Sequence, residues 1–197
     1  TNSRTGGAFG LSVADGNYKV QANVPWNSVG LANTAQCAIT VASGAITTAA
    51  GGCVQNDGTL KLALRAPNLT MTLKYADGTV AAYANVNVGL GKWNTNSQSN
   101  KDGQVALFID RAAIMAANPT LTGSANDLWI TVDPPYGTSN MVRWDCRSGD
   151  TNKPVCSGMT DFNVAAEYPT TTLGNVTVLG PNTKLRVMDP TTSANVG

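Results

Sequence analysis

The four cysteines are the residues of this chain most able to form covalent bonds, and they fall into two local pairs, Cys37 with Cys53 and Cys146 with Cys156. Neither pair has Cys-x-x-Cys spacing and the chain has no histidine, so a zinc site is disfavoured. The alternative to disulfides is four free thiols in a reducing compartment. An even cysteine count in a chain of low charge favours two disulfides, each stabilising the fold by about 3 kcal/mol. We therefore predict an extracellular or cell-surface location.

Carboxylates are the other groups with catalytic potential. A Ser-His-Asp or Cys-His site lacks its base, because there is no histidine. A pair of carboxylates is able to serve a glycosidase, but a role in turns is favoured for most of the acidic residues. A role in turns or caps is also favoured over calcium binding for two acidic sets that lack a recognisable loop spacing. We expect no enzymatic activity, no cofactor and no metal site. The turn residues are Asp15, Asp57, Asp77 and Asp102, and the two sets are Asn126-Asp127 with Asp133, and Asp145 with Asp150 and Asp161.

Trp26 and Tyr136 are the aromatic residues with the best case for stacking against a ligand. Each follows the proline that ends a predicted strand. Aromatic side chains on an exposed strand face are able to stack against a sugar ring. Packing in the core or between domains is favoured for the aromatic residues as a group, which includes Trp26, Trp93, Trp129, Trp144, Tyr83 and Tyr136.

The composition excludes several partners. Charged residues make up 13% of the chain, the net charge is +1 and no basic cluster is present, so nothing attracts nucleic acid. No run of about 18 apolar residues occurs, so we predict no membrane insertion. Thr, Asn, Ser and Gly supply the polarity instead, which is typical of exposed strand faces and turns.

Alternation of apolar and polar residues predicts an all-β fold. Asp-Gly pairs supply turns, since glycine adopts positive φ without steric cost. One helical turn is predicted at 111–117, closed by Asn118-Pro119. Short strands separated by turns indicate a sandwich or a barrel. The predicted strands are 10–14, 18–24, 38–42, 60–65, 70–75, 80–88, 104–110, 128–132, 141–145, 163–168, 176–179 and 183–188.

Similar motifs recur in the same order in the two halves of the chain. Residues 1–3 read Thr-Asn-Ser, as do 95–97, the strand 18–25 corresponds to 128–135, and a cysteine pair follows each strand. Chance similarity between two halves rich in Thr, Asn and Gly is the alternative. We predict two tandem β-sandwich units. Residues 1–66 form a unit that lacks its first strands, 67–179 form a complete unit, and 180–197 are leading strands that complete 1–66 of the same or the next chain.

Residues 68–135 also carry an ordered set of motifs, listed from the chain start as Thr72-Leu73-Lys74, Asp77-Gly78-Thr79-Val80, Ala84-Asn85-Val86-Asn87-Val88, Asp102-Gly103-Gln104-Val105 and Trp129-Ile130-Thr131-Val132-Asp133-Pro134. This order resembles the prealbumin-like sandwich of carboxypeptidase-regulatory-like and collagen-adhesin B-type repeat domains. The resemblance implies an Ig-like or prealbumin-like sandwich in a cell-surface protein. Some relatives form an isopeptide bond between a lysine and Asn or Asp, and the resemblance makes Lys74 and Asp133 the candidates. A solvated strand lysine is the favoured alternative.

The cysteine pairs, the repeat and the missing catalytic groups together predict a structural role. We expect a building block of an extracellular filament, stalk or array of tandem β-sandwich units, which are circularly permuted or completed by strand exchange with a neighbouring copy. The alternative is an adhesin module that binds carbohydrate or a cell-surface protein.

Overall fold

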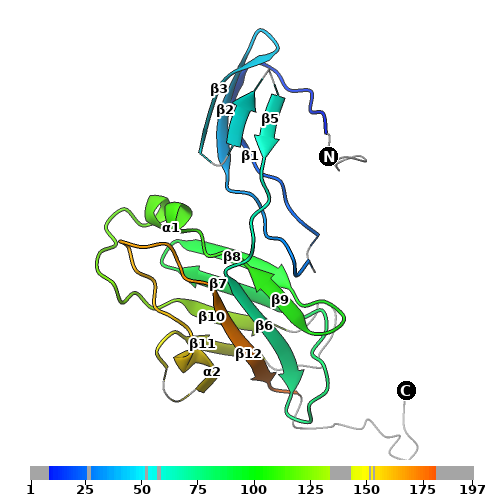
Figure 1. Cartoon of the computed structure of the whole chain (residues 1–197), viewed down its shortest axis with the longest axis vertical. Coiled ribbons are helices and arrows are strands. Elements are labelled where there is room, and N and C mark those ends of the chain that lie inside the picture. Colours follow the sequence, from blue (N-terminus) through cyan, green and yellow to red (C-terminus); the bar gives the residue numbers. More distant parts are fainter. Residues whose placement is uncertain are drawn as a thin grey trace, which may run out of the picture. The chain divides into compact units, whose positions relative to one another are not determined.

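The computed structural model describes residues 9–25, 28–51, 53–56, 59–133, 143–150, 152 and 154–180. The chain divides into two compact units: unit 1 contains Thr1–Pro25 and Leu31–Ala66, and unit 2 contains Trp26–Gly30 and Pro67–Gly197. Strands form most of the regular structure of both units (Figure 1), which confirms the all-β prediction. In these ranges no helix has the length and apolar character needed to cross a membrane.

Unit 1 contains a three-stranded antiparallel sheet and a separate hairpin. The sheet order is β1-β2-β3, and β4 pairs with β5. β2 buries every second residue, so one face of the sheet covers a small core whose buried members are Cys37, Ile39 and Val41. The bounds are β1 Gly16–Val20, β2 Cys37–Ala42, β3 Ala45–Gly51, β4 Cys53–Asn56 and β5 Thr59–Leu62.

Ser43 and Gly44 form the two-residue turn between β2 and β3. Both have positive φ, 52° and 74°, as a type I′ hairpin turn requires. The Asp15 carboxylate accepts hydrogen bonds from Ser43 N (2.9 Å) and Gly44 N (3.2 Å). These bonds, that of Ser43 first, hold the pKa of Asp15 below its ordinary value. The stabilisation is therefore present above the ordinary pKa of the carboxyl and is lost as the pH falls through the lowered pKa.

Unit 2 contains two sheets. One has four antiparallel strands in the order β11-β10-β7-β8, and the other has the order β12-β6-β9. In the second sheet β6 pairs antiparallel with β9 and parallel with β12. The bounds are β6 Leu69–Tyr75, β7 Asn85–Leu90, β8 Trp93–Gln98, β9 Gln104–Leu107, α1 Arg111–Ala117, β10 Trp129–Asp133, β11 Trp144–Arg147, α2 Pro154–Ser157 and β12 Thr171–Val178.

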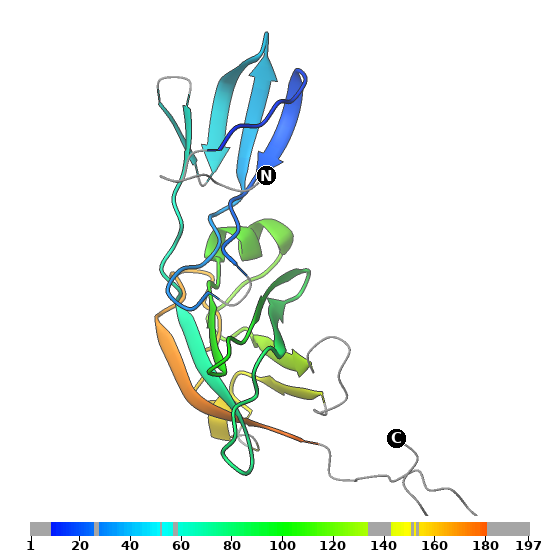
Figure 2. The same ribbon diagram turned by 90° about the vertical axis from the view of Figure 1, so that its right-hand side faces the viewer.

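The two sheets of unit 2 enclose one hydrophobic core, which confirms a β-sandwich. Figure 2 shows β6 and β12 on one side of the unit and β10 and β11 on the other. In the constant-type immunoglobulin sandwich the first two strands share a sheet. Here β6 and β7 lie in opposite sheets, so the likeness to that fold is in the packing of the two sheets and not in the strand order. Core residues from both sheets include Leu69, Met71, Leu73, Val105, Val176, Val86, Val88, Ile130 and Val132.

Helix α1 confirms the predicted helical turn, and its end is tied to the β7–β8 hairpin. At the N-terminus, Asp110 accepts a hydrogen bond from Ala113 N (3.0 Å). At the C-terminus, Asn118 Nδ2 donates to Leu90 O (3.1 Å), and Asn118 Oδ1 accepts from Lys92 N (2.9 Å). One amide side chain therefore links the helix to the turn between the two strands.

Asn68 joins three segments of unit 2. Its Oδ1 accepts a hydrogen bond from Ile109 N (2.7 Å), and its Nδ2 donates to Ile109 O (3.1 Å). Its backbone N donates to Leu107 O (3.0 Å), and its carbonyl accepts from Thr171 N (2.8 Å). Only 8% of Asn68 is exposed, so these bonds form in the interior. The residue fixes the start of β6 against the end of β9 and the start of β12.

Two predicted strands are absent. Residues 10–14 have no ladder partner, and Asn163 lies in a turn in which its Oδ1 accepts a hydrogen bond from Ala165 N (2.8 Å). That local bond replaces the strand pairing predicted for 163–168. Residues 183–188 and the Asp57-Gly58 pair lie outside the described residues. β3, β4 and β8 were not predicted.

The two units do not share a strand order among the described residues. Unit 1 has one sheet and a hairpin, whereas unit 2 has two sheets packed on one core. The internal duplication therefore stays a prediction. So does the role of segment 180–197, because everything after Gly180 lies outside the described residues.

Candidate functional site

Both cysteine pairs form the predicted disulfides. Cys37 and Cys53 join β2 to β4 with a Cα–Cα distance of 5.5 Å, and Cys146 and Cys156 join β11 to α2 with a distance of 6.2 Å. Cys37, Cys146 and Cys156 are buried, so both bonds belong to the cores of their units. In unit 1 the disulfide is a large part of a core with few buried residues, which is a common arrangement in small secreted domains.

The structure does not bring Lys74 and Asp133 together. Lys74 alternates with the buried Leu73 on β6, so it lies on the outer face of the three-stranded sheet. Asp133 lies on the outer face of the other sheet, where Asn87 Nδ2 donates to its Oδ2 (3.4 Å) and Arg143 Nε is 3.6 Å from its Oδ1. The hydrophobic core separates the two side chains, so this arrangement does not permit the isopeptide bond.

The predicted stacking pair, Trp26 and Tyr136, lies outside the described residues. The other aromatic residues named from the sequence have different surroundings. Trp93 is buried and Trp144 packs against the core of unit 2, as predicted for core residues. Tyr83 is 47% exposed and has a positive φ of 60°. Trp129 is half-buried on the outer face of the four-stranded sheet.

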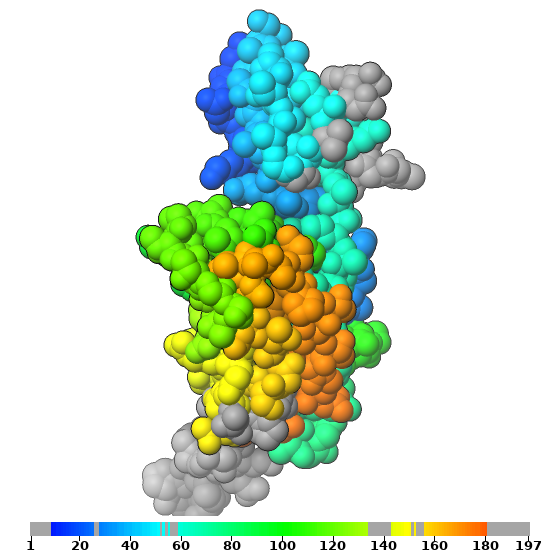
Figure 3. Space-filling model, turned by 60° about the vertical axis from the view of Figure 1, so that its left-hand side comes forward, coloured from blue at the N-terminus to red at the C-terminus, as the bar shows by residue number. Residues whose placement is uncertain are grey.

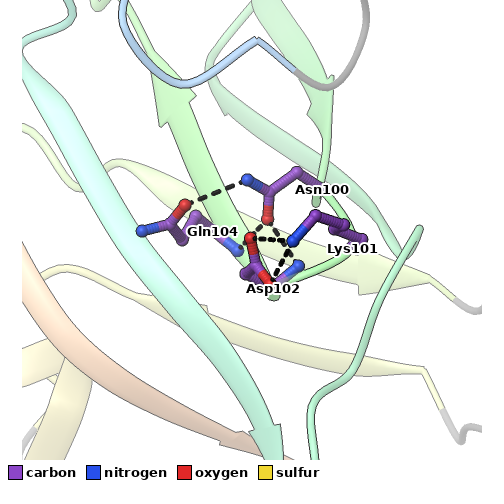
Figure 4. Close-up of polar contacts among 4 residues, drawn as sticks. All are labelled: Asn100, Lys101, Asp102 and Gln104. Atoms are coloured by element: carbon purple, nitrogen blue, oxygen red, sulfur yellow. Dashed lines mark hydrogen bonds and ion pairs between the residues drawn. The ribbon is translucent and has the colours of Figure 1, made fainter.

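The acidic residues of the described segments do not form a metal site. No group of three or more His, Cys, Asp or Glu residues lies together there, so Asp145, Asp150 and Asp161 do not assemble as a calcium set. Figure 4 shows a typical case, the turn between β8 and β9, where Asn100 Oδ1 accepts from Asp102 N and Gln104 N, both at 2.9 Å. Lys101 Nζ lies 2.9 Å from Asp102, and this hydrogen bond raises the pKa of the lysine. Asp102 therefore acts in a turn, as the sequence predicts.

Unit 1 has a shallow hollow of about 510 Å³ on the outer face of its sheet. It forms where Ala38 and Ala50, on adjacent strands, leave space beside the longer Lys19. The polar residues beside them are Asn17, Thr40 and Thr48. Thr40 Oγ1 donates to Asn17 Oδ1 (2.8 Å), so part of this polar row is already paired within the sheet.

Strand β12 is an edge of its sheet and carries no charged residue. Thr172, Asn175 and Thr177 are exposed, whereas Val176 and Val178 are buried in the core. A bulge between Thr172 and Asn175 interrupts the pairing with β6. Helix α2 contacts β12, and Figure 3 shows the surface of β12, in orange, open beside it.

The outer face of the four-stranded sheet is polar, and amides are its most frequent side chains. Alternation places the buried valines of β7 and β10 in the core, and every second residue faces outward. The cross-strand register brings these residues into three rows, and Arg143, which precedes β11, lies beside the third row through its ion pair with Asp133. We call this surface the amide face, and its residues are Arg147, Trp129, Gly89 and Asn94 in the first row, Asp145, Thr131, Asn87 and Asn96 in the second, and Arg143, Asp133, Asn85 and Gln98 in the third.

Comparison with known proteins identifies no relative: no family model matches the chain, and no curated protein or solved structure matches it. The resemblance of 68–135 to the prealbumin-like repeat domains therefore stays a prediction. The motifs that carry it lie on or beside four strands of unit 2, β6, β7, β9 and β10.

Sequence reasoning did not single out the amide face, although the sequence holds its signal. Asparagines alternate with valines in β7 and with Thr or Ser in β8, and Trp129 alternates with the apolar residues of β10. The missing information was the register, which places Gly89 opposite Trp129.

Proposed function

We propose that this chain is a non-catalytic structural building block of an extracellular filament, stalk or array of β-sandwich units. The main support is the parallel pairing of β6 and β12, the first and last strands described in unit 2. Leu69 is opposite Thr171, and Tyr75 is opposite Val178. The chain therefore enters the sandwich at one end and leaves it at the other.

Two further observations support an extracellular structural role. Both disulfides are of a kind that persists in oxidising compartments. The motif order of 68–135 resembles that of cell-surface repeat domains. Neither observation depends on the strand pairing, so the proposal has three separate supports.

We propose that neighbouring copies associate through β12. Its outer edge has no charged side chain or proline, which are two of the means by which proteins block an exposed edge. A strand from a second copy is able to pair with its backbone, and main-chain hydrogen bonds would supply most of the affinity. The bulge confines regular pairing to the segment from Asn175 to Val178.

The test is the oligomeric state of the full chain over a wide concentration range, measured by sedimentation velocity and electron microscopy. We expect oligomers or fibres at high concentration. The double substitution Asn175→Lys/Thr177→Lys adds charge to the edge without touching the core, and it should shift the protein to monomer.

The matched control is Thr70→Lys/Thr72→Lys on the central strand β6. It adds the same charge to the same face of the same sheet, on the central strand instead of the edge strand. The control should assemble as the parent does. A parent chain that stays a folded monomer at every concentration contradicts the proposal, and equal effects of the two double substitutions contradict the assignment to β12.

A further inference from the structure

On the amide face, the indole ring of Trp129 packs against the backbone of β7 at Gly89. Trp129 is opposite Gly89, and its Cζ2 and Cε2 atoms lie 2.3 and 2.6 Å from the place a Cβ on Gly89 would occupy. Glycine is required there, because any side chain would displace the indole. The ring rests on β7 and is half-buried. The Trp129 side chain is therefore already ordered in the free protein, so it loses less conformational entropy when a ligand stacks on it.

Polar groups with unused hydrogen-bonding capacity surround this ring. Asn94 is next in the row beyond Gly89, Asn96 lies in the following row, and Arg147 is beside Trp129 on β11. All three are exposed, and no side chain of the described segments bonds to them. An amide both donates and accepts hydrogen bonds, which matches a hydroxyl group that does the same.

The charges of the amide face balance. Asp133 and Asp145 are matched by Arg143 and Arg147, and Asp133 already pairs with Arg143. The face therefore has no net field to attract an anionic or cationic polymer. Its width of four strands is about 14 Å, and its three rows span about 13 Å. That area suits several linked small rings.

We propose that the amide face binds a neutral oligosaccharide. The apolar C–H face of one sugar ring stacks on the Trp129 indole, whose flat apolar body and polar N–H suit such a ligand. Asn94 and Asn96 bond to hydroxyls on one side of that ring, and Arg147 bonds to a hydroxyl on the other. This site is independent of the structural role proposed above, because its residues lie outside β12 and the β6–β12 pair.

The experiment measures binding of the full chain to maltotriose, cellotriose, mannotriose and chitotriose by titration calorimetry, with shifts of the indole N–H signals followed by NMR. We expect at least one trisaccharide to bind and to shift the Trp129 signal. Asn94→Ala/Asn96→Ala and Trp129→Ala should each weaken binding at least tenfold. The asparagine variant is the safer of the two for folding, since both of its side chains are exposed.

The matched control is Tyr83→Asn, which removes an exposed aromatic ring outside the amide face, at a positive φ that asparagine tolerates. Its binding should equal that of the parent. The proposal is overturned if none of the four sugars binds, or if the asparagine variant binds as the parent does. Binding confined to sulfated or uronic glycans and lost in salt also overturns it, since charge would then be the basis of recognition.

Discussion

At the residue scale, the interior position of Asn68 distinguishes it from the other asparagines in the described part of unit 2. Asn68 begins an Asn-Leu-Thr sequence and Asn175 begins an Asn-Val-Thr sequence, so both match the acceptor pattern for N-glycosylation. Asn68 is buried and its amide is fully engaged, whereas Asn175 is exposed on β12. The sequence shows the two sites as equivalent, and only the fold separates them.

We predict that Asn68→Ala lowers the free energy of unfolding by about 2–3 kcal/mol, because the N–H and the C=O of Ile109 lose their partner in the interior. Denaturant unfolding followed by tryptophan fluorescence measures this change. Asn96→Ala, at an exposed position of β8, is the control and should change stability by less than about 0.5 kcal/mol. Equal effects of the two substitutions would show that the hydrogen bonds of Asn68 contribute little.

At the element scale, strands with clear alternation could be predicted from the sequence. The segments 38–42, 70–75 and 128–132 each lie within one or two residues of an observed strand. β3 was missed because Ala-Ile-Thr-Thr-Ala-Ala has little contrast between its two faces, and because its turn is Ser-Gly rather than Asp-Gly. The sequence predicts that Asp15 acts in a turn at its own position, whereas its carboxylate bonds to the Ser43-Gly44 turn, which is distant in sequence.

For the candidate site too, contacts between residues close in sequence could be predicted, whereas those that depend on the path of the chain could not. Disulfide pairing could be predicted because each pair is local. Lys74 and Asp133, the isopeptide candidates that the resemblance implies, lie in opposite sheets, because the choice of sheet for each strand depends on the chain path, which the sequence does not reveal. The stacking pair Trp26 and Tyr136 is untested, since both lie outside the described residues.

We predict that two glycine-to-alanine substitutions will distinguish the stability cost of backbone strain from the added cost of a clash with Asn118, at the end of α1. Gly78→Ala introduces strain at a φ of 84° with open space around the new methyl, and should cost about 1–2 kcal/mol. Gly91→Ala adds a clash with the Asn118 side chain at a φ of 56°, and should cost at least about 1 kcal/mol more, because the Asn118 hydrogen bonds are lost. Thermal unfolding measures the difference, and equal losses would mean that Asn118 moves aside freely.

At the scale of the whole molecule, the two units differ in what stabilises them. Among the described residues, the core cluster of unit 1 has three buried members, one of them the disulfide-bonded Cys37, whereas the core of unit 2 draws on both of its sheets. Small domains with little core depend more on covalent links.

We therefore predict that Cys37→Ser/Cys53→Ser unfolds unit 1 and leaves unit 2 folded. Cys146→Ser/Cys156→Ser should destabilise unit 2 by about 3 kcal/mol without unfolding it. Two-dimensional amide NMR spectra distinguish the outcomes, because signals of each unit are lost or retained as a set. Persistence of dispersed unit 1 signals in the first variant would show that its core suffices without the disulfide.

The parallel β6–β12 pair also determines how unit 2 responds to mechanical force. A pull applied where the chain enters and leaves acts along both strands in opposite senses, so it loads the ladder from Leu69–Thr171 to Tyr75–Val178 in shear. The backbone hydrogen bonds of this ladder then have to break together rather than one after another. The interruption at Gly174 splits this ladder into two patches, so the longer patch, from Asn175 to Val178, would set the rupture force under tension.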